Sequence, residues 1–585
     1  MQVQASSFCP GLMSSYLKSK GGSLSTHHCK NCSASFEISA EEAAFFERMS
    51  FVAGGEQITI SLPTYCPLCR LQRRMAHRNQ IYVLLGKVRG QADPRFSMYF
   101  EGAPFPVVTN EDWWGQVGWS PEEHGREFDF SRLFFEQFAE LRAQVPRAAV
   151  NAALSDNSSY CNNVASLKNC YFVFDANTIE DSFYLETAVA VRDSVDCSSV
   201  DNCELCYDCA GCRRCYSLQS SDHCLDCTES FFLLNCRSCR NCFGCANLIQ
   251  SQYCIFNKQH TKEQYEAFVA AQALGSWSGR EKVRQRVDAF RATFPRPHLY
   301  GSRCEMVSGN HIHSARQVED SFMIREGERL RYCFACSQQV NDCQDLTIWG
   351  QKAELIYEGI VCGNNVFHLL FCFNCWNGSS DLTYCDTCHG SSHLFGCVSM
   401  VKRQHCILNR QYSEEEYQAL LPRIVRHMRK TGEWGEFFPA SLALVPYNYS
   451  LAQRYFPLSK EEVLQRGLWW HEPRGAEARI SAGAIAAAAL PDVLPQGDVA
   501  IVALSAVSGK PFRITTEEIR RYRKLNVPLP RLTYDERMNA RMARVGGVRL
   551  HERSCDKTGR LLRSIHPPEA GYPVWDREEF EREMV

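Results

Sequence analysis

The sequence predicts a multidomain, mainly β protein with two tandem β-solenoids, of the parallel β-helix kind, in its middle. At 585 residues the chain far exceeds the size at which one hydrophobic core keeps growing, so several modules are expected. Short apolar segments bounded by Asp, Asn, Ser and Gly recur about every 12 residues, or at twice that spacing, within residues 155–258. The same region returns as a second copy further along the chain. Short, evenly spaced strands are typical of solenoids, in which like residues stack from coil to coil.

The duplication is clearest where each copy ends. Cys254-Ile-x-Asn-Lys-Gln-x-Thr261 matches Cys406-Ile-x-Asn-Arg-Gln-x-Ser413, 152 residues later. In both copies a hydroxyl residue follows that can cap a helix, because Gln264 and Glu416 complete capping boxes. We therefore predict a first β-solenoid at 151–260, a helical insertion at 261–298, a second β-solenoid at 299–411 and a helical segment at 412–470.

Two CxxC pairs near the N-terminus predict a metal site. Their residues are Cys29, Cys32, Cys66 and Cys69. Four thiolates at such spacing match the tetrahedral site of structural zinc, which is closed and leaves no coordination position for a substrate. We therefore predict a four-cysteine zinc ribbon at 24–80, with zinc in a structural role.

The residues around these cysteines also resemble a known domain. His28-Cys-Lys-Asn-Cys, the helix with Glu42 and Pro63-x-x-Cys-Pro-x-Cys-Arg70 resemble the zinc-ribbon, treble-clef-like domain of many uncharacterised bacterial proteins. Together with the Asn-Cys-Tyr coils, the chain looks like a family of large, uncharacterised Cys-rich zinc-ribbon proteins of candidate-phylum bacteria. The resemblance implies an architecture and no established activity.

A second internal repeat joins the two ends of the chain. Phe36-x-Ile-Ser-x-Glu-Glu matches Phe512-x-Ile-Thr-x-Glu-Glu. The four cysteine positions have become Ser505, Ser508, Thr533 and Glu536 in the C-terminal copy. The sequence therefore predicts a degenerate, metal-free ribbon at 498–585, a Gly-, Pro- and Ala-rich linker at 471–497, and a ribbon-like hairpin with an aromatic helical connector at 81–150.

Both ribbons carry arginines on a predicted helix. The N-terminal set spans an arc of about 140 degrees at 100 degrees per residue. Guanidinium groups pair bidentately with phosphate, so this face suggests contact with nucleic acid, for example ribosomal RNA. The alternative is that the arginines pair with acids of the chain itself, such as Glu122, Glu123 and Glu127. The predicted nucleic-acid-binding residues are Arg70, Arg73, Arg74, Arg78, Arg537, Arg541 and Arg544.

The solenoid cysteines allow two interpretations. Runs such as Cys236-x-x-Cys239-x-x-Cys242-x-x-Cys245 approach the spacing of iron–sulfur ligands. In the second copy, however, Cys239 and Cys242 correspond to Ser and Leu, which favours small structural core residues over a cluster. Further zinc sites are a third possibility, for which the candidate ligands are Cys333, Cys336, Cys372, Cys375, Cys385 and Cys388.

The sequence shows no phosphate loop, HExxH or GxSxG motif, and enzymatic activity is left open but not favoured. A β-helix enzyme acting on polysaccharide would need clustered carboxylates. The acids that could supply them are Asp193, Asp196, Asp201, Asp208, Asp222 and Asp226. They stand where turn residues are expected. The sequence favours a non-enzymatic, zinc-binding scaffold that contacts a protein or RNA; a redox metal-cluster protein and the polysaccharide enzyme are the alternatives.

Composition limits the partners. The formal net charge is -2, so there is no general attraction to nucleic acid or membrane. The first residues lack the apolar run of a secretory signal, which leads us to expect a cytoplasmic protein without membrane contact. In a reducing cytosol the 32 cysteines should be thiols or metal ligands. The oligomeric state and the partner stay open.

Overall fold

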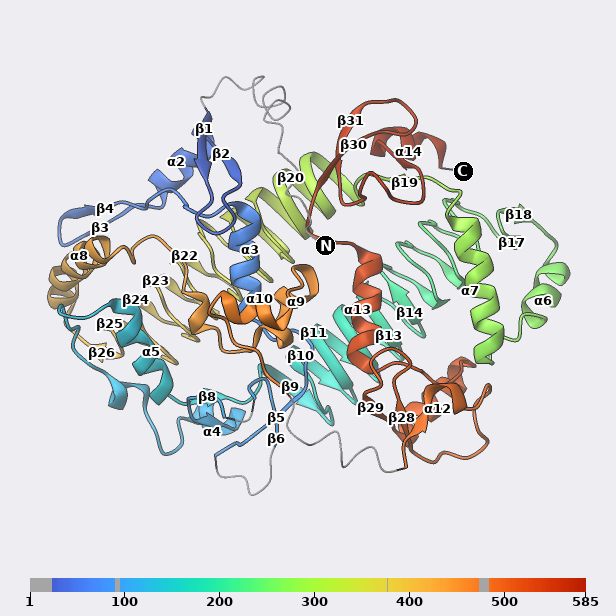
Figure 1. The fold of residues 1–585 in the computed structure, drawn as a ribbon, viewed down its shortest axis with the longest axis horizontal. Helices are drawn as coiled ribbons and strands as arrows, with labels where there is room; N and C mark the ends of the chain where they lie inside the picture. Colours follow the sequence, from blue (N-terminus) through green and yellow to red (C-terminus); the bar gives the residue numbers. More distant parts are fainter. Residues whose placement is uncertain (1–23, 90–94, 101, 376, 473–482, 585) are drawn as a thin grey trace.

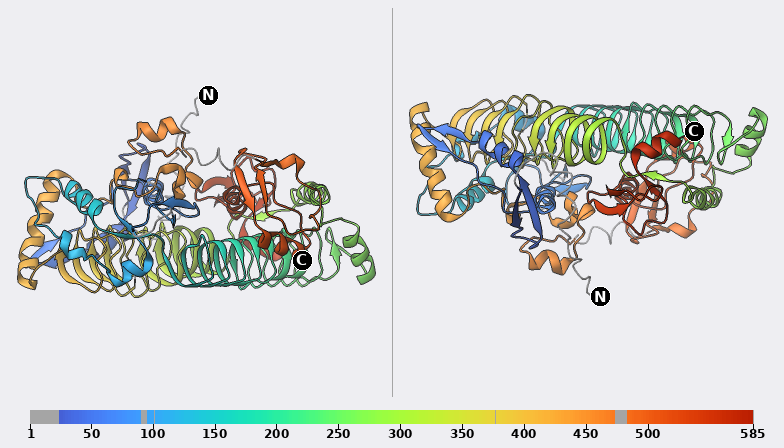
Figure 2. Two further views of the ribbon diagram at one scale, coloured as in Figure 1. Left: turned by 90° about the horizontal axis from the view of Figure 1, so that it is seen from below. Right: turned by 90° about the horizontal axis from the view of Figure 1, so that it is seen from above.

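Two β-solenoids form the centre of the molecule. The computed structural model describes residues 24–89, 95–100, 102–375, 377–472 and 483–584. Seen from the side, the coils of both solenoids make one elongated row, and the remaining elements lie mostly on one side of it (Figure 2). The predicted multidomain, mainly β architecture with solenoid modules is confirmed.

The first solenoid is built from parallel coils of 12 residues. Cys197 pairs with Cys209, and Val195 with Tyr207, in the neighbouring coil. Its strands form one eight-stranded sheet in sequential order. They are β9 (Ala152–Asp156), β10 (Asn162–Lys168), β11 (Tyr171–Glu180), β12 (Phe183–Arg192), β13 (Val195–Asp201), β14 (Tyr207–Ala210), β15 (Tyr216–Gln219) and β16 (Thr228–Phe231).

Every third residue of a coil has a left-handed backbone. Tyr160, Asn163, Ser166 and Asn169, for example, have φ between 53 and 57°. This conformation costs most L-residues about 1–2 kcal/mol, and Asn and Asp tolerate it best. It turns the chain after every three residues, which explains the Asn, Asp and Ser in the predicted turns. The residue that follows each turn lies in the core, so a 12-residue coil has four inward positions.

The inward positions hold small side chains, with cysteine prominent among them. The Sγ of Cys209 donates to the carbonyl oxygens of Tyr207 at 3.5 Å and Leu218 at 3.3 Å. At an equivalent position the Oγ of Ser182 donates to the carbonyl oxygen of Glu180 at 2.8 Å. Cysteine and serine therefore make equivalent hydrogen bonds to the backbone of the narrow core, where a thiol behaves as a small, weakly polar group.

The second solenoid has longer coils in its middle. Phe367 pairs with Ser380, 13 residues on, whereas Ser380 pairs with Ser392 after 12. Single-residue insertions of this kind hide part of the repeat from a comparison at constant offset. The strands are β20 (Gly301–Arg331), β21 (Ser337–Gln344), β22 (Phe367–Leu370), β23 (Ser380–Thr383), β24 (Ser392–Phe395), β25 (Gln404–Ile407) and β26 (Arg410–Gln411).

Both solenoids end in the same way. Cys254 pairs with Gln259 in one antiparallel hairpin, and Cys406 with Gln411 in the other. The capping boxes predicted at Thr261 and Ser413 are both present. The elements after the two solenoids are β17 (Cys254–Ile255), β18 (Lys258–Gln259), α6 (Lys262–Ala270), α7 (Trp277–Arg291), β19 (Arg296–Pro297), α8 (Glu414–Thr431), η3 (Ala440–Leu442), η4 (Tyr447–Tyr449), α9 (Leu451–Tyr455) and α10 (Lys460–Gln465).

The N-terminal part consists of short hairpins and helices. We call residues 24–80 the N-terminal knuckle unit. The elements here are β1 (Leu24–His28), β2 (Ser35–Ser39), α2 (Ala40–Arg48), β3 (Phe51–Ala53), β4 (Glu56–Ile58), α3 (Pro67–Ala76), β5 (Leu84–Gly86), β6 (Arg95–Ser97), β7 (Val107–Val108), α4 (Asn110–Gly115), η2 (Pro121–His124), α5 (Phe134–Gln144) and β8 (Arg147–Ala148).

The C-terminal part repeats this pattern. We call residues 498–545 the C-terminal knuckle unit. Of the predicted linker 471–497, residues 473–482 lie outside the described residues. The elements are β27 (Ile485–Ala486), η5 (Ala487–Ala489), β28 (Ile501–Leu504), β29 (Pro511–Ile514), α12 (Thr516–Leu525), α13 (Tyr534–Val545), β30 (His551–Ser554), β31 (Leu561–Ser564), β32 (Val574–Trp575) and α14 (Arg577–Glu583).

Each knuckle unit packs on the solenoid that is further from it in the sequence. Helix α3 of the N-terminal unit lies against the second solenoid, through Arg70 and Asp345 (Figure 1). Helix α13 of the C-terminal unit lies against β13 and β14 of the first solenoid, through Arg541 and Asp196 (Figure 1). The N-terminal knuckle unit thus covers the second solenoid, and the C-terminal knuckle unit covers the first.

Candidate metal centre

The four N-terminal cysteines come together in space. Cys29 and Cys32 lie in the turn between β1 and β2, Cys66 caps the N-terminus of α3, and Cys69 follows in its first turn. Their four Sγ atoms all lie within 4.8 Å of one another. Among the described residues this is the one group of three or more His, Cys, Asp or Glu side chains arranged to hold a metal ion.

The geometry of the group fits a tetrahedral metal ion. With Zn–S bonds of about 2.3 Å, the sulfur atoms of a tetrahedral site lie about 3.8 Å apart. The Sγ atoms of Cys32 and Cys66 are 3.8 Å apart. The side-chain amide of Asn31 donates to the Sγ of Cys69 at 3.2 Å, which favours a thiolate there. The hydrogen bond between Cys66 and Cys69 lowers the pKa of Cys66 to about 5 and raises that of Cys69, which the hydrogen bond from Asn31 opposes.

The helix that carries two of these ligands projects its arginines into the second solenoid. Arg70 pairs with Asp345 through Nε and Oδ2 at 2.8 Å. Arg74 pairs with the same carboxylate at 3.0 Å, and its Nε donates to Thr347 at 2.8 Å. Arg73 pairs with Glu358 and, at 3.1 Å, with Glu436.

The C-terminal helix α13 makes equivalent contacts with the first solenoid. Arg541 pairs with Asp196 at 2.9 Å, and its Nε donates to Ser198 at 3.1 Å. Arg537 pairs with the same carboxylate at 3.2 Å. Arg544 pairs with Asp208 at 3.0 Å.

The arginines predicted to bind nucleic acid are therefore not an exposed face. Arg70, Arg74, Arg78 and Arg541 are at most 4% exposed. Their partners are solenoid carboxylates rather than the acids named as candidates, since Glu122 and Glu127 pair with Arg403 and Arg410. A buried guanidinium with a carboxylate partner is not available to an external phosphate, so this arrangement gives nucleic-acid binding no support.

In the C-terminal knuckle unit a hydrogen-bonded cluster occupies the positions of the four metal ligands. The Glu536 carboxylate accepts from Ser505 Oγ at 2.5 Å, from the Ser508 amide at 3.2 Å and from the Thr533 amide at 2.9 Å. Burial acts to raise the pKa of Glu536, but these bonds hold it below its usual value. A carboxylate with its donors thus joins the turn to the helix, where the N-terminal unit has four thiols.

A third turn of the same kind was missed in the sequence. Cys555 N donates to Arg560 O, and Gly559 N to Cys555 O, as Cys29 and Ser33 do in the first turn. Asp576, which caps α14, donates through its amide to the Sγ of Cys555 at 3.2 Å. The signal was Cys555-x-x-Thr-Gly, which matches Ser505-x-x-Ser-Gly. A single cysteine in this copy left no CxxC pair to find.

The other candidate zinc ligands lie in the core of the second solenoid. All six are at most 1% exposed. Cys385 donates to the carbonyl oxygens of Thr383 and Leu394, each at 3.5 Å, and Cys388 to that of Cys397 at 3.6 Å. These thiols do not converge into a metal-binding group within the part of the chain that the structure describes. They are Cys333, Cys336, Cys372, Cys375, Cys385 and Cys388.

The aspartates considered for polysaccharide chemistry are engaged in ion pairs. Asp193, Asp196, Asp208 and Asp226 have the left-handed backbone of the coil corners, which agrees with their interpretation as turn residues. Asp222 contacts Arg291 and Arg544, and Asp201 lies near Arg213 and Arg325.

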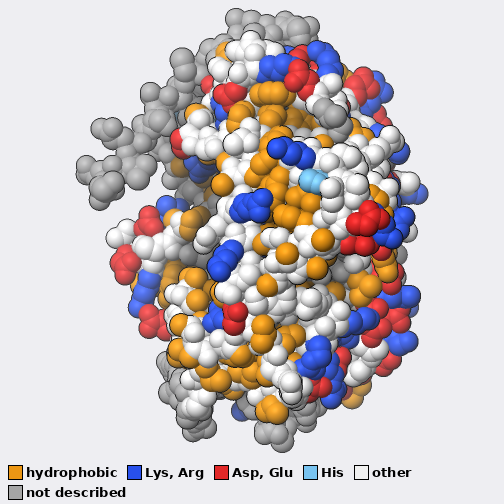
Figure 3. Space-filling model, turned by 90° about the vertical axis from the view of Figure 1, so that its right-hand side faces the viewer, with side chains coloured by type: hydrophobic (Ala, Val, Ile, Leu, Met, Phe, Trp, Pro, Cys, Tyr) orange, Lys and Arg blue, Asp and Glu red, His pale blue; other side chains and the backbone are white. Residues whose placement is uncertain are grey.

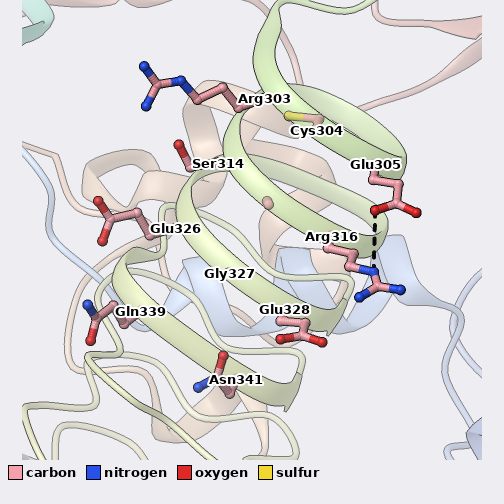
Figure 4. A pocket seen from close by; sticks show the side chains of 11 residues that line it. Arg303, Cys304, Glu305, Ser314, Arg316, Glu326, Gly327, Glu328, Gln339 and Asn341 are labelled. Carbon is pink, nitrogen blue, oxygen red and sulfur yellow. Dashed lines mark ion pairs between the residues drawn. The ribbon is translucent and has the colours of Figure 1, made fainter.

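Two surface features lie away from these sites. An open hollow of about 630 Å³ lies along the first coils of the second solenoid, where Glu305 and Arg316 pair at 3.5 Å and Glu326 and Gln339 line the other side (Figure 4). At the far end of the first solenoid, hydrophobic side chains gather across the face beside α6 (Figure 3). The partly buried residues of the cluster there are Phe231, Tyr253, Phe256, Phe268 and Val269.

In the described ranges, every helix is too short or too polar to cross a bilayer. No disulfide joins the cysteines of this part of the chain. No protein-family model matches the chain, and neither does any curated protein sequence.

Proposed function

We propose that the protein is a non-catalytic scaffold in which one zinc ion, bound by Cys29, Cys32, Cys66 and Cys69, fixes the helix that joins the N-terminal unit to the second solenoid. The zinc has four protein ligands and therefore no open position for a substrate. Its role is to hold α3 in place so that Arg70 and Arg74 reach Asp345. The scaffold then presents its solenoid surfaces to a partner.

The observation that carries this proposal is the comparison of the two knuckle units. Both place an arginine helix on a solenoid through the same contacts, yet the C-terminal unit does so with Ser505, Ser508, Thr533 and Glu536 in place of the thiols. A metal that one copy can replace with hydrogen bonds supports a structural role rather than a reaction.

The test is metal analysis combined with cobalt replacement. We expect one zinc per chain, lost in Cys69→Ser and kept in the matched variant Cys239→Ser, whose cysteine lies in the solenoid core. Replacing zinc with Co²⁺ should give the spectrum of a tetrahedral tetrathiolate site, because all four ligands are sulfur. Added imidazole or cyanide should leave that spectrum unchanged, since the site is closed.

Two results would contradict the proposal. Retention of one zinc by Cys69→Ser would show that the metal lies elsewhere, and a cobalt spectrum that changes on addition of imidazole would show an open position. Iron and a visible chromophore in anaerobically purified protein would favour a redox cluster in the solenoid instead.

A further inference from the structure

A cleft of about 230 Å³ lies where the two solenoids meet. Its walls come from equivalent coils of both modules, at residues 163–213 on one side and 311–364 on the other. Figure 1 shows these coils, with β20 above β10 and β11, at the centre of the molecule. Pockets at the interface of two modules are frequent ligand sites.

Two arginines in this cleft are short of hydrogen-bond acceptors. Arg213 and Arg325, one from each solenoid, approach the same carboxylate, Asp201, at 3.7 and 3.6 Å. These distances are too long for hydrogen bonds. The Nε of Arg213 is buried without a hydrogen-bond partner, and the nearest carboxylate to Arg325, that of Asp201, is 3.6 Å away. By contrast, the Nε atoms of Arg74 and Arg541 each donate a hydrogen bond within the chain.

The charges of the cleft favour an anion. Arg78, Arg213 and Arg325 face two carboxylates, Asp175 and Asp201, which leaves one positive charge in excess. Burial, together with the nearby charge of Arg213, lowers the pKa of Arg325, although Asp201 opposes this. A guanidinium in this position is stabilised by a further negative charge.

The two histidines of the cleft are neutral at pH 7. Burial lowers the pKa of His311 to about 4 and that of His313 to about 2. His311 Nε2 lies 2.9 Å from the carbonyl oxygen of Val545, and His313 Nδ1 lies 2.9 Å from Ser302 Oγ. They add polar ring edges without adding charge.

We propose that this cleft binds a small organic anion, whose carboxylate or phosphate lies between Arg213 and Arg325 and whose carbon body contacts the apolar wall. That wall includes Met323, Ile348 and Val361. The planar fork of a guanidinium matches both oxyanions bidentately. The inference rests on the proposed function, because the anion would be a ligand of the proposed scaffold.

The experiment compares phenyl phosphate, benzoate and uncharged benzamide by calorimetry at constant ionic strength, on the full zinc-loaded chain. We expect at least one anion to bind and benzamide not to bind. Arg213→Gln and Arg325→Gln should each weaken that anion about tenfold or more, because a hydrogen bond to a charged group is lost. The matched control is Arg214→Gln, whose side chain is 54% exposed and pairs with Asp226 outside the cleft.

The outcome separates the possible ligands and the two proposals. Preference for phenyl phosphate over benzoate identifies a phosphate ligand, and the reverse identifies a carboxylate. Equal binding of benzamide, affinity unchanged in both cleft variants, or no binding of either anion at millimolar concentration overturns the inference. Zinc content is measured on the same samples, so a failure of the scaffold proposal shows as missing zinc whatever the anion does.

Discussion

Arg74 and Arg541, which are 467 residues apart in the sequence, make the same three contacts with different solenoids. Each pairs with an aspartate, at 3.0 and 2.9 Å, and donates through Nε to a hydroxyl, of Thr347 or Ser198. Each also donates to a tyrosine carbonyl, at 3.5 and 3.2 Å. The arginine contact is therefore the feature that both copies of the duplicated unit have kept.

Loss of the shared carboxylate should destabilise the protein strongly. Asp345 is fully buried and pairs with both Arg70 and Arg74, so Asp345→Asn leaves Arg70 with a neutral partner and Arg74 with Glu358, at 3.8 Å, as its charged partner. Removing one member of a buried ion pair typically costs about 3–5 kcal/mol. We expect a loss of this size in urea unfolding, followed by circular dichroism.

The matched control is Glu180→Gln, which breaks the pair with Arg192, a side chain that is 60% exposed. Surface pairs of this kind contribute less than about 1 kcal/mol. Equal effects of the two substitutions would show that the arginine contacts do not hold the halves together.

Cysteines of the solenoid core should tolerate replacement by serine. Cys209 is fully buried and donates to the carbonyl oxygens of Tyr207 and Leu218. Because serine already occupies equivalent inward positions, Cys209→Ser should cost only about 1 kcal/mol. Cys209→Phe should destabilise the protein by about 3 kcal/mol or more, since the narrow core cannot accept a ring. Unfolding midpoints measure both, and a serine variant as unstable as the phenylalanine variant would argue for a role beyond packing.

Glu42 should make stability depend on pH. Its side chain is 3% exposed, and burial raises its pKa to about 7, with Arg70 acting in the opposite direction. The folded state therefore holds a proton that the unfolded state loses near pH 4.5. The contribution of protonated Glu42 to the free energy of unfolding is complete below pH 4.5 and is lost as the pH rises through 7.

We expect the wild-type chain to lose about 3 kcal/mol between pH 4.5 and 8 relative to Glu42→Gln, since each pKa unit corresponds to about 1.4 kcal/mol. Gln at this position keeps an oxygen for the amide of Gln344, which donates to Glu42 at 2.8 Å. The free energy of unfolding of both proteins, measured across this range, checks the sign. A constant difference between them would mean that Glu42 does not titrate as stated.

A second metal site can be built in the C-terminal knuckle unit. Ser505, Ser508, Thr533 and Glu536 hold the same places relative to α13 as the four cysteines hold relative to α3. Replacing all four with cysteine should raise the zinc content from one to two per chain. The double variant Ser505→Cys, Ser508→Cys supplies only two thiols and should stay at one. A quadruple variant that folds but binds no second zinc would show that the two units differ in backbone geometry.

Local sequence patterns predicted much of the fold. The 12-residue spacing, the hydroxyl caps at Thr261 and Ser413 and the two CxxC pairs are short-range signals, and the structure contains each of them. A second short repeat was missed. Leu141-Arg-Ala-x-x-Pro-Arg147 matches Phe290-Arg-Ala-x-x-Pro-Arg296. The match has too few identical residues to be recognised in the sequence alone. It becomes clear in the structure, where α5 packs on the second solenoid and α7 on the first.

The contacts between distant segments could not be read from the sequence. An arc of arginines on a helix looks the same whether it faces solvent or the buried carboxylate of Asp345, because the acid lies 275 residues away. The cleft has the same origin: Arg213 and Arg325 belong to different solenoids and meet only when the two modules pack.

Because each knuckle unit packs on the solenoid further from it in the sequence, the first solenoid receives its knuckle unit late in synthesis. The coils of the first solenoid leave the ribosome before residues 258–497, while α13, which packs on them, follows only afterwards. At about 5–20 residues per second, this face waits on the order of tens of seconds for its partner. Asp196 lies on this face and pairs with Arg537 and Arg541, whereas Asp208 also pairs with Arg284 of α7, which is synthesised earlier. We therefore expect Asp196 to lack its arginine partners until the C-terminal unit has been synthesised.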